Sequence, residues 1–404
     1  MMTFSLIQRA TPLRNLRCVQ ARLFGSLTTK KVNHKLLQQV KSKFCSTTSS
    51  NTVSKAQKLV GYWLLGCSGA VAGAVTLGGI TRLTKSGLSM TDWHLIRGMK
   101  PPRSHEEWMS EFERYQSFPE FKLARSDMTL NEFKTIFYME YYHRMYGRFV
   151  GLAFYIPAGY FWYKGFFSKG MKTRAVIFGS LILGQGLLGW YMVKSGLNDQ
   201  SRANTNEPRV SQYRLAAHLG LAFTVFSGLF YQSLAHLLKE NPIKYTKEIG
   251  RLKKFAHTSM ALTFVTAMSG AFVAGLEAGL VYNSFPKFAD RWIPSDIAAL
   301  NPWWKNLFEN PTTTQFNHRI LGTTTFASVA TVFYLARPLG LPPRARLAAN
   351  CLLGMACVQV GLGIATLLLY VPTHLAASHQ FGSLSLLSVA IWLNYELKSG
   401  KIPK

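Results

Sequence analysis

The chain has 404 residues, with 46 lysines and arginines against 18 aspartates and glutamates, a formal net charge of +28, and 48% hydrophobic residues. Only 16% of the residues are charged, and the apolar ones fall in runs near the ~18–20 residues needed to cross a bilayer. These numbers exclude disordered, fibrous and ordinary soluble classes. They predict a basic polytopic membrane protein that contacts membrane lipid and has no nucleic-acid partner.

The first 50 residues have the composition of a targeting segment. The first acidic residue is Asp92, whereas residues 1–58 contain eleven basic side chains among Ser, Thr, Gln and Leu. An Arg-rich, Ser-rich segment without acids is typical of a mitochondrial transit peptide, and no apolar core of a secretory signal precedes Leu59. We therefore predict that residues 1–50 are a transit peptide and disordered leader. The alternative is a basic, disordered cytosolic arm.

Eight later segments are apolar and long enough to form membrane-spanning helices. They cover residues 59–80, 141–163, 175–197, 212–237, 255–280, 315–336, 347–371 and 374–397. Divided in order, they give an N-terminal four-helix unit, a linker, a C-terminal four-helix unit and a tail, over residues 51–238, 239–254, 255–398 and 399–404.

The loops between these segments differ in charge, which predicts their orientation. One set, with the leader, is strongly basic: residues 164–174, 239–254, 337–346 and the tail. The other set holds most of the acids: residues 81–139, 198–211 and 281–314. By the positive-inside rule, the basic set and both termini face the matrix of a mitochondrion. The long segment 81–139 then lies on the intermembrane-space side of the inner membrane.

The two four-helix units resemble each other. Segments 141–163 and 315–336 share the motif H-R-x-x-G, which begins at His143 and His318. Three further pairs match in the same order, through Ser-Gly-Ala at Ser68 and Ser269, through a Gly and Gln pattern, and through Leu-Ala-Ala before His218 and His379. Because each unit has an even number of spans, both have the same orientation, related by a pseudo-twofold axis along the membrane normal. The predicted fold class is all-α, with eight transmembrane helices in two pseudo-twofold-related four-helix bundles.

This duplication selects four of the ten histidines, His143, His218, His318 and His379. A strongly polar group at membrane depth is a functional-site hypothesis by default. Two imidazoles on neighbouring helices can hold a metallo-cofactor, and heme fits because imidazole is a standard axial ligand. A zinc site would need three or four ligands close together. The alternative is that these histidines only form hydrogen bonds between helices.

The two units differ three residues before the first histidine, where one has Glu140 and the other Gln315. Glu140 and His143 lie on one helix face, with Cβ atoms ~5–6 Å apart. A carboxylate beside one heme and an amide beside the other predict unequal roles. The first site would bind heme as a substrate, with Glu140 as acid/base or as a stabiliser of developing positive charge. The second would hold a permanent heme that carries electrons.

Arginines near the histidines are the expected partners of heme propionates, because a guanidinium matches a carboxylate. These are Arg144, Arg148 and Arg319. They could instead be anchors at the membrane interface, and Glu140 could merely pair with Arg144 or Arg148. The sequence assigns no role to Glu277 or His374.

Long motifs carry a resemblance to a known family. They are GGITRLTKSGLSMTDWHLIRGMKPP from Gly78, FPEFKLARSDMTLNEFKTIFYMEYYHRMYGR over 118–148, GLEAGLVYNSFP over 275–286 and FNHRILG over 316–322. In these the chain resembles the heme A synthase family, across residues 59–397. The resemblance implies an eight-helix enzyme that oxidises the C8 methyl of heme O to a formyl group, giving heme A for cytochrome c oxidase assembly.

The same resemblance implies roles for individual residues and partners. Glu140 would be the catalytic carboxylate, His143 and His218 would bind the substrate and product heme, and His318 and His379 would be the axial ligands of heme b. Implied partners are heme O synthase, ferredoxin and ferredoxin reductase as electron source, and cytochrome c oxidase assembly factors, with a homo-oligomer as a further expectation.

Two rival functions come from other classes. A diheme b-type electron carrier, such as a quinol oxidoreductase, would not need the difference between Glu140 and Gln315. A transporter built from repeats would be expected to have broken helices at the midplane, whereas the polar residues here gather near one surface.

Overall fold

The computed structural model describes residues 34–93, 100–197, 210–239, 241 and 243–398, with side chains from residue 55 onward. The described residues fall into two units, divided between positions 55 and 56. The predicted transit peptide lies outside the described residues up to position 33, as does the predicted tail over 399–404. The second unit contains every predicted site residue.

Helices make up the regular structure of the described residues, apart from a single bridge between Phe288 and Arg291. The long helices are α2 (His34–Leu83), α5 (Leu130–Tyr163), α6 (Lys169–Leu197), α7 (Gln212–Leu237), α8 (Lys247–Leu276), α10 (Pro311–Ala336), α11 (Pro343–Leu368) and α12 (Thr373–Glu396). The short ones are α3 (His105–Gln116), α4 (Pro119–Ala124), α9 (Asn306–Glu309) and the 3₁₀ turns Ala278–Leu280 and Trp303–Lys305. The all-α prediction is therefore confirmed.

Six of the described helices are long and apolar enough to cross a membrane: residues 55–83 of α2, and α6, α7, α8, α10 and α11. Helices α5 and α12 lie at two further predicted spans but do not meet this measure. Their polar residues explain why, because α5 carries Glu140, His143, Arg144 and Arg148, and α12 carries His379 with two amides and four serines.

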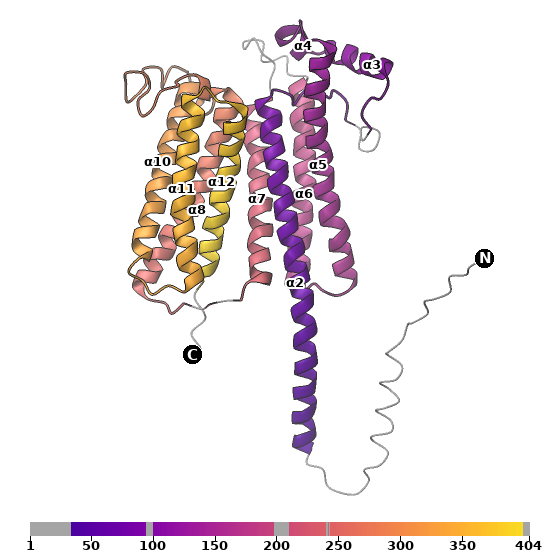
Figure 1. The fold of residues 1–404 in the computed structure, drawn as a ribbon, viewed down its shortest axis with the longest axis vertical. Coiled ribbons are helices and arrows are strands. Elements are labelled where there is room, and N and C mark those ends of the chain that lie inside the picture. The colour runs from indigo at the N-terminus through magenta and orange to yellow at the C-terminus, as the bar shows by residue number, and fades with distance from the viewer. Residues whose placement is uncertain (1–33, 94–99, 198–209, 240, 242, 399–404) are drawn as a thin grey trace, which may run out of the picture. The chain divides into compact units, whose positions relative to one another are not determined.

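Helix α5 begins at Leu130, well before the predicted start at 141, because Thr129 and Glu132 form a capping box there. Its first turns lie outside the predicted span and pack on α3 (Figure 1). Trp108 and Tyr115 of α3 lie in one aromatic cluster with Phe133 of α5. Burial of these rings stabilises a small core in the predicted intermembrane-space segment.

The predicted linker over 239–254 is shorter in the structure. Helix α8 starts at Lys247, where the Thr246 hydroxyl accepts a hydrogen bond from the Ile249 amide and caps the helix. Hydroxyl caps of this kind satisfy one of the open amides of a first turn.

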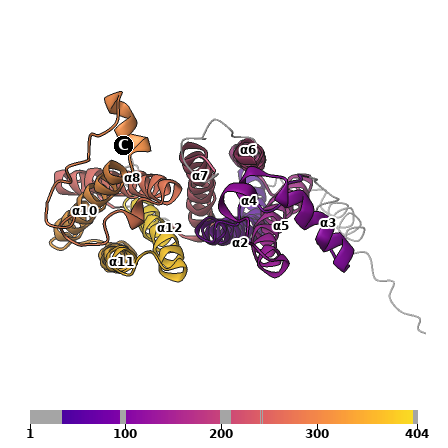
Figure 2. The same ribbon diagram turned by 90° about the horizontal axis from the view of Figure 1, so that it is seen from above.

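Two apolar cores organise the second unit. One lies mainly among α2, α5, α6 and α7, which we call the N-terminal half, and the other among α8, α10, α11 and α12, which we call the C-terminal half. Figure 2 shows α10 and α11 beside α8 and α12. The halves meet where α7 packs on α8 and α12, and where the Gln380 amide of α12 donates to the Val75 carbonyl of α2 at 3.0 Å.

Charged residues join the halves at the ends of α2 and α8. Glu277 lies 3.2 Å from the Lys85 ammonium and 3.7 Å from the Arg82 guanidinium. Lys85 and Glu277 both have left-handed backbones, with φ of 52° and 55°. Each therefore turns the chain just after its helix, and Glu277 acquires the structural role that its sequence did not indicate.

Candidate functional site: two histidine pairs

Each of the four predicted histidines packs against a glycine on a neighbouring helix. A Cβ atom added to that glycine would lie within 2.8 to 3.2 Å of the histidine Cε1 atom. The pairs are Gly78 with His143, Gly189 with His218, Gly270 with His318 and Gly363 with His379. All four rings are half-buried. Only glycine leaves room for an imidazole in this position, so the four sites share one construction.

The histidines form two pairs, one in each half. The rings of His318 and His379 have centroids 6.3 Å apart and are nearly perpendicular, at 88°. That spacing leaves room for one metal atom bonded to a nitrogen of each ring at about 2 Å. In the N-terminal half, His143 and His218 are close enough to interact electrostatically. The structure therefore brings together the residues that the sequence grouped.

A glutamine fixes the second histidine of each pair. The Gln185 amide of α6 donates to the His218 carbonyl at 3.0 Å, and the Gln359 amide of α11 donates to the His379 carbonyl at 2.8 Å. The sequence showed these glutamines as part of the helix similarity but gave them no role.

Glu140 is buried, with 2% of its surface exposed, and its carboxylate accepts four hydrogen bonds. Oε2 accepts from the Ser89 hydroxyl at 2.7 Å and from the Met90 amide at 2.8 Å. Oε1 accepts from Nε of Arg144 at 3.0 Å and from a terminal guanidinium nitrogen at 2.5 Å. The pairing with Arg144 that the sequence left open is therefore present. These donors hold the Glu140 carboxylate in one position, one helical turn before His143.

Gln315 occupies the corresponding place in the C-terminal half, with 3% of its surface exposed. Its amide nitrogen donates to the carbonyls of Ala278 and Tyr282 at 2.8 and 3.2 Å. Its oxygen accepts from the Arg319 guanidinium at 3.0 Å. The amide thus binds backbone acceptors where the carboxylate of Glu140 binds donors, and it carries no charge.

Both arginines also hold the loop beside their histidine. Arg144 donates to the carbonyls of Met90 and Asp92 at 2.8 and 2.9 Å, and its guanidinium lies over the Trp93 ring. Arg319 donates to the Tyr282 carbonyl at 3.0 Å. This anchoring was not predicted. Arg148 is half-buried on α5, and His374 is exposed.

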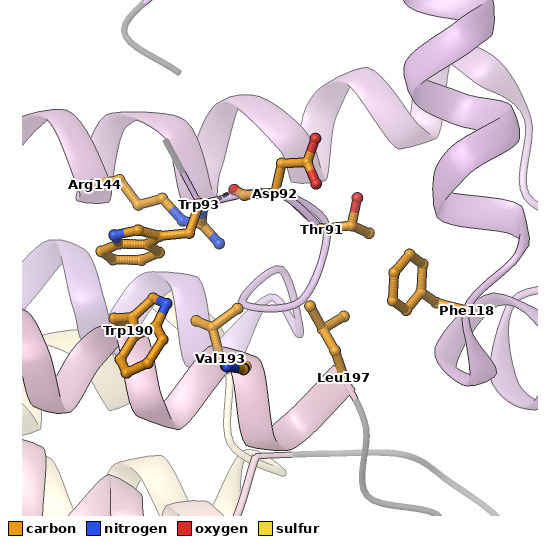
Figure 3. A pocket seen from close by; sticks show the side chains of 9 residues that line it. Thr91, Asp92, Trp93, Phe118, Arg144, Trp190, Val193 and Leu197 are labelled. Atoms are coloured by element: carbon orange, nitrogen blue, oxygen red, sulfur yellow. Dashed lines mark hydrogen bonds between the residues drawn. The ribbon is translucent and has the colours of Figure 1, made fainter. Parts of the chain in front are cut away.

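A cavity of about 280 Å³ lies against Arg144. Figure 3 shows Trp93 and Arg144 on one side and Trp190 of α6 on the other, with Phe118 at the far end. Lys194 also lines the cavity, and its ammonium lies 4.9 Å from the Trp190 ring. Two of the lining residues come directly after residues of the first histidine pair in sequence, since Arg144 follows His143 and Trp190 follows Gly189, which contacts His218.

One acidic residue in the loop of each half has a shifted pKa, and the two shifts have opposite directions. Burial raises the pKa of Glu120 in α4 to about 7, Arg125 opposes this shift, and the charge of Glu140 adds to it. In the other loop, the Thr312 hydroxyl bonds to Asp296 at 2.6 Å and lowers the pKa of that carboxyl below its usual value.

Heme fits the residues that are present. The ring spacing of His318 and His379 admits one iron atom between them, and the four glycines leave room for the imidazoles. Nδ1 of His143, His218 and His379 is buried without a hydrogen-bond partner. His318 differs, because its Nδ1 lies 2.7 Å from the Ser269 hydroxyl. Two imidazoles per half are the usual axial ligand set of a b-type heme.

The structure shows that one part of the predicted repeat, the correspondence of Ser68 with Ser269, is wrong. Ser68 and Ser269 share a Ser-Gly-Ala motif, but Gly270 beside Ser269 contacts His318, whereas the glycine that contacts His143 is Gly78. The correct partner of Ser269 is therefore Leu77. Small-residue motifs recur along packed membrane helices, so the shorter match was misleading.

The comparisons with known proteins cover nearly the whole described chain. A family model described as cytochrome oxidase assembly protein matches residues 61–391. A heme A synthase of Bos taurus is 57% identical over 349 residues, which are 86% of this chain and 84% of that protein. A heme A synthase of Nitrosospira multiformis is 44% identical over 346 residues, 85% of this chain and 94% of that protein. One from Saccharomyces cerevisiae is 40% identical over 376 residues, 86% of this chain and 77% of that protein.

Proposed function

Because the chain belongs to the family of cytochrome oxidase assembly proteins, and its relatives include heme A synthases, we propose that it performs the heme A synthase reaction. It oxidises the C8 methyl group of heme O to a formyl group. The chemistry is two successive hydroxylations of one carbon, each of which uses dioxygen as the oxidant with two electrons and two protons and releases one water. Loss of water from the resulting geminal diol then gives the aldehyde of heme A.

The observation that carries the division of labour is the exchange of Glu140 for Gln315 within otherwise matching surroundings. The N-terminal half takes heme O as substrate between His143 and His218. The C-terminal half keeps a heme b between His318 and His379, which supplies electron-transfer chemistry when bound. Only the first half has a carboxylate one helical turn before its first histidine.

Glu140 acts as the catalytic carboxylate through its charge. Four donors hold the carboxylate in one position, so it is better suited to stabilise positive charge that develops on the substrate than to pick up a proton. A preorganised charge in a site shielded from water contributes strongly to lowering a barrier. Arg144, Arg148 and Arg319 are the proposed contacts of heme propionates, and the cavity beside Arg144 is the proposed outer end of the substrate site.

The same proposal covers the finer architecture. Helices α5 and α12 complete eight membrane spans in two pseudo-twofold-related bundles of the mitochondrial inner membrane, with both termini in the matrix and the heme sites near the intermembrane space. Heme O synthase supplies the substrate, ferredoxin and its reductase supply electrons, and assembly factors of cytochrome c oxidase receive the product. The protein associates with copies of itself.

The test is pigment analysis of the full-length protein, purified after expression with and without a source of heme O. We expect a b-type absorbance spectrum in both cases and extractable heme A only when heme O is supplied. Heme b alone in both cases would favour the diheme electron carrier, and a protein without heme would contradict both functions. An alanine variant of the exposed His257 at the other end of α8 is the control for variants of the four ligands.

A further inference from the structure

Three contacts between α8 and α10 form a ladder of hydroxyl hydrogen bonds. Ser259 bonds to Ser328 at 2.7 Å, Thr266 to Thr325 at 2.8 Å, and Ser269 to Nδ1 of His318 at 2.7 Å. The ladder therefore runs along the helix pair and ends on a predicted heme ligand.

The direction of the last bond follows from its neighbours. The Ser269 hydroxyl donates its proton to the Thr266 carbonyl at 2.7 Å, so its oxygen is left to accept from His318. Nδ1 of His318 then carries the proton, and Nε2 keeps the lone pair that binds a metal. A hydrogen bond to the outer nitrogen fixes the tautomer and the ring orientation of a ligating histidine.

The matching helix pair in the N-terminal half has lost this ladder. The contact of the Cys67 thiol with the Ala153 carbonyl, 3.5 Å away, occupies the place of the contact between Ser259 and Ser328. Counting along the helices from these two contacts, Ala74 and Val150 correspond to Thr266 and Thr325 of the C-terminal half. In the same register, Leu77 corresponds to Ser269.

His143 consequently differs from His318 although both pack on glycine. Nδ1 of His143 is buried and has no hydrogen-bond partner, because the side chain of Leu77 offers no acceptor. A ligand without an outer hydrogen bond is less firmly oriented and a weaker donor to iron.

We propose that Ser269 is a positioning residue that makes His318 a permanent heme ligand, and that leucine at the matching position, Leu77, lets the first site release its heme. The inference rests on the proposed function in one respect: a site that exchanges heme suits a substrate and product, and a site that retains heme suits a resident group.

The experiment compares full-length Ser269→Ala, Ser269→Thr and Leu77→Ser with the unchanged protein. Transfer of heme b to excess apomyoglobin measures release, and a spectroelectrochemical titration measures the heme midpoint potential. We expect Ser269→Ala to release heme b about 10-fold faster or more, the lower end of the effect of losing an outer partner. We also expect its midpoint potential to rise, because a less electron-rich imidazole stabilises ferric iron less.

The threonine variant separates positioning from packing. Ser269→Thr keeps the hydroxyl and should retain both the slow release and the original potential, and Leu77→Ser should slow release of heme from the first site. Unchanged release and potential in Ser269→Ala, or a threonine variant that behaves like alanine, would overturn the inference. These readouts do not involve heme A, so a protein that makes none could still show the Ser269 effect. A protein that binds no heme would overturn both proposals.

Discussion

The surroundings of His143 and His318 are built to one plan. In each, an arginine one residue after the histidine bonds to a loop carbonyl, and a glycine on the preceding long helix supports the ring. The two sites differ in charge, since Glu140 is replaced by Gln315, and in the outer bond of the histidine. A duplicated frame can therefore specialise through a few side chains while the packing around its ligands stays the same.

Removing a predicted heme ligand should cause the largest difference in function between the two halves. We expect His318→Ala to lower the affinity for heme b by more than the ~10–100-fold effect of removing a hydrogen-bond partner of a ligand. His143→Ala should retain the b-type spectrum and lose heme A formation, because its histidine serves the other site. Absorbance spectra and chromatography of extracted hemes measure both. Equal loss of heme b in the two variants would break the comparison, and His257→Ala should behave as the unchanged protein.

Filling the glycine contacts should have the next largest effect. A Cβ at position 78 or 363 would lie 2.8 Å from a histidine Cε1, so alanine must displace the ring. Displacement of a reacting group by ~1 Å can cost about 100-fold. We expect Gly78→Ala to reduce heme A formation by 10- to 100-fold on this scale, and Gly363→Ala to reduce heme b content.

The glycines of the two H-R-x-x-G motifs provide matched controls for these variants. A Cβ on Gly147 or Gly322 would meet no atom within 4 Å. Alanine there should leave both hemes unchanged and favour the helix slightly. Equal losses in the controls would show that helix packing, and not the histidine contact, explains the effect.

The two loops should respond to pH in opposite directions. Since the pKa of Glu120 is raised from 4.5 to about 7, the folded protein binds a proton that the unfolded chain has released. The free energy of unfolding therefore falls as pH rises from about 4.5 to about 7, by on the order of 3 kcal/mol. Glu120→Gln should remove this loss, so its melting temperature should exceed that of the unchanged protein at pH 8 but not at pH 4.5.

Asp296 gives the contrasting result. Its lowered pKa means that its contribution to stability is present above the usual value of 3.8 and is lost as pH falls. Asp296→Asn should therefore destabilise the protein at pH 8, and the difference should shrink in acid. Tryptophan fluorescence during heating measures both variants, and a common direction of change would contradict the contrast.

The smallest effect is expected at the charged contact between the halves. Lys85 is 47% exposed and Glu277 is 27% exposed, and such pairs contribute about 0–1 kcal/mol. Lys85→Glu should lower the melting temperature slightly, and adding Glu277→Lys should restore it. Failure of the double variant to recover would show that the contact depends on more than the two charges.

Much of this arrangement could be predicted from the sequence, because the H-R-x-x-G motifs mark both histidines and place Glu140 one turn before His143. The start of α5 at Leu130 could not be predicted from the apolar pattern, because it depends on a capping box and on an aromatic cluster with α3. The bonds from Ser89 and Met90 to Glu140 join residues about fifty positions apart, and no local pattern indicates them. The correspondence of Leu77 with Ser269 could be found only from the contacts of Gly78 with His143 and of Gly270 with His318.

The exchange of carboxylate and amide tests the division of labour most directly. Glu140→Gln and Gln315→Glu are made separately in the full-length protein, heme O is supplied, and the extracted hemes are separated by chromatography. We expect Glu140→Gln to reduce heme A at least about 100-fold, within the range for a catalytic group, with the heme b spectrum intact, and Gln315→Glu to keep forming heme A. Normal heme A formation by Glu140→Gln would contradict a catalytic role for the charge that distinguishes the two halves.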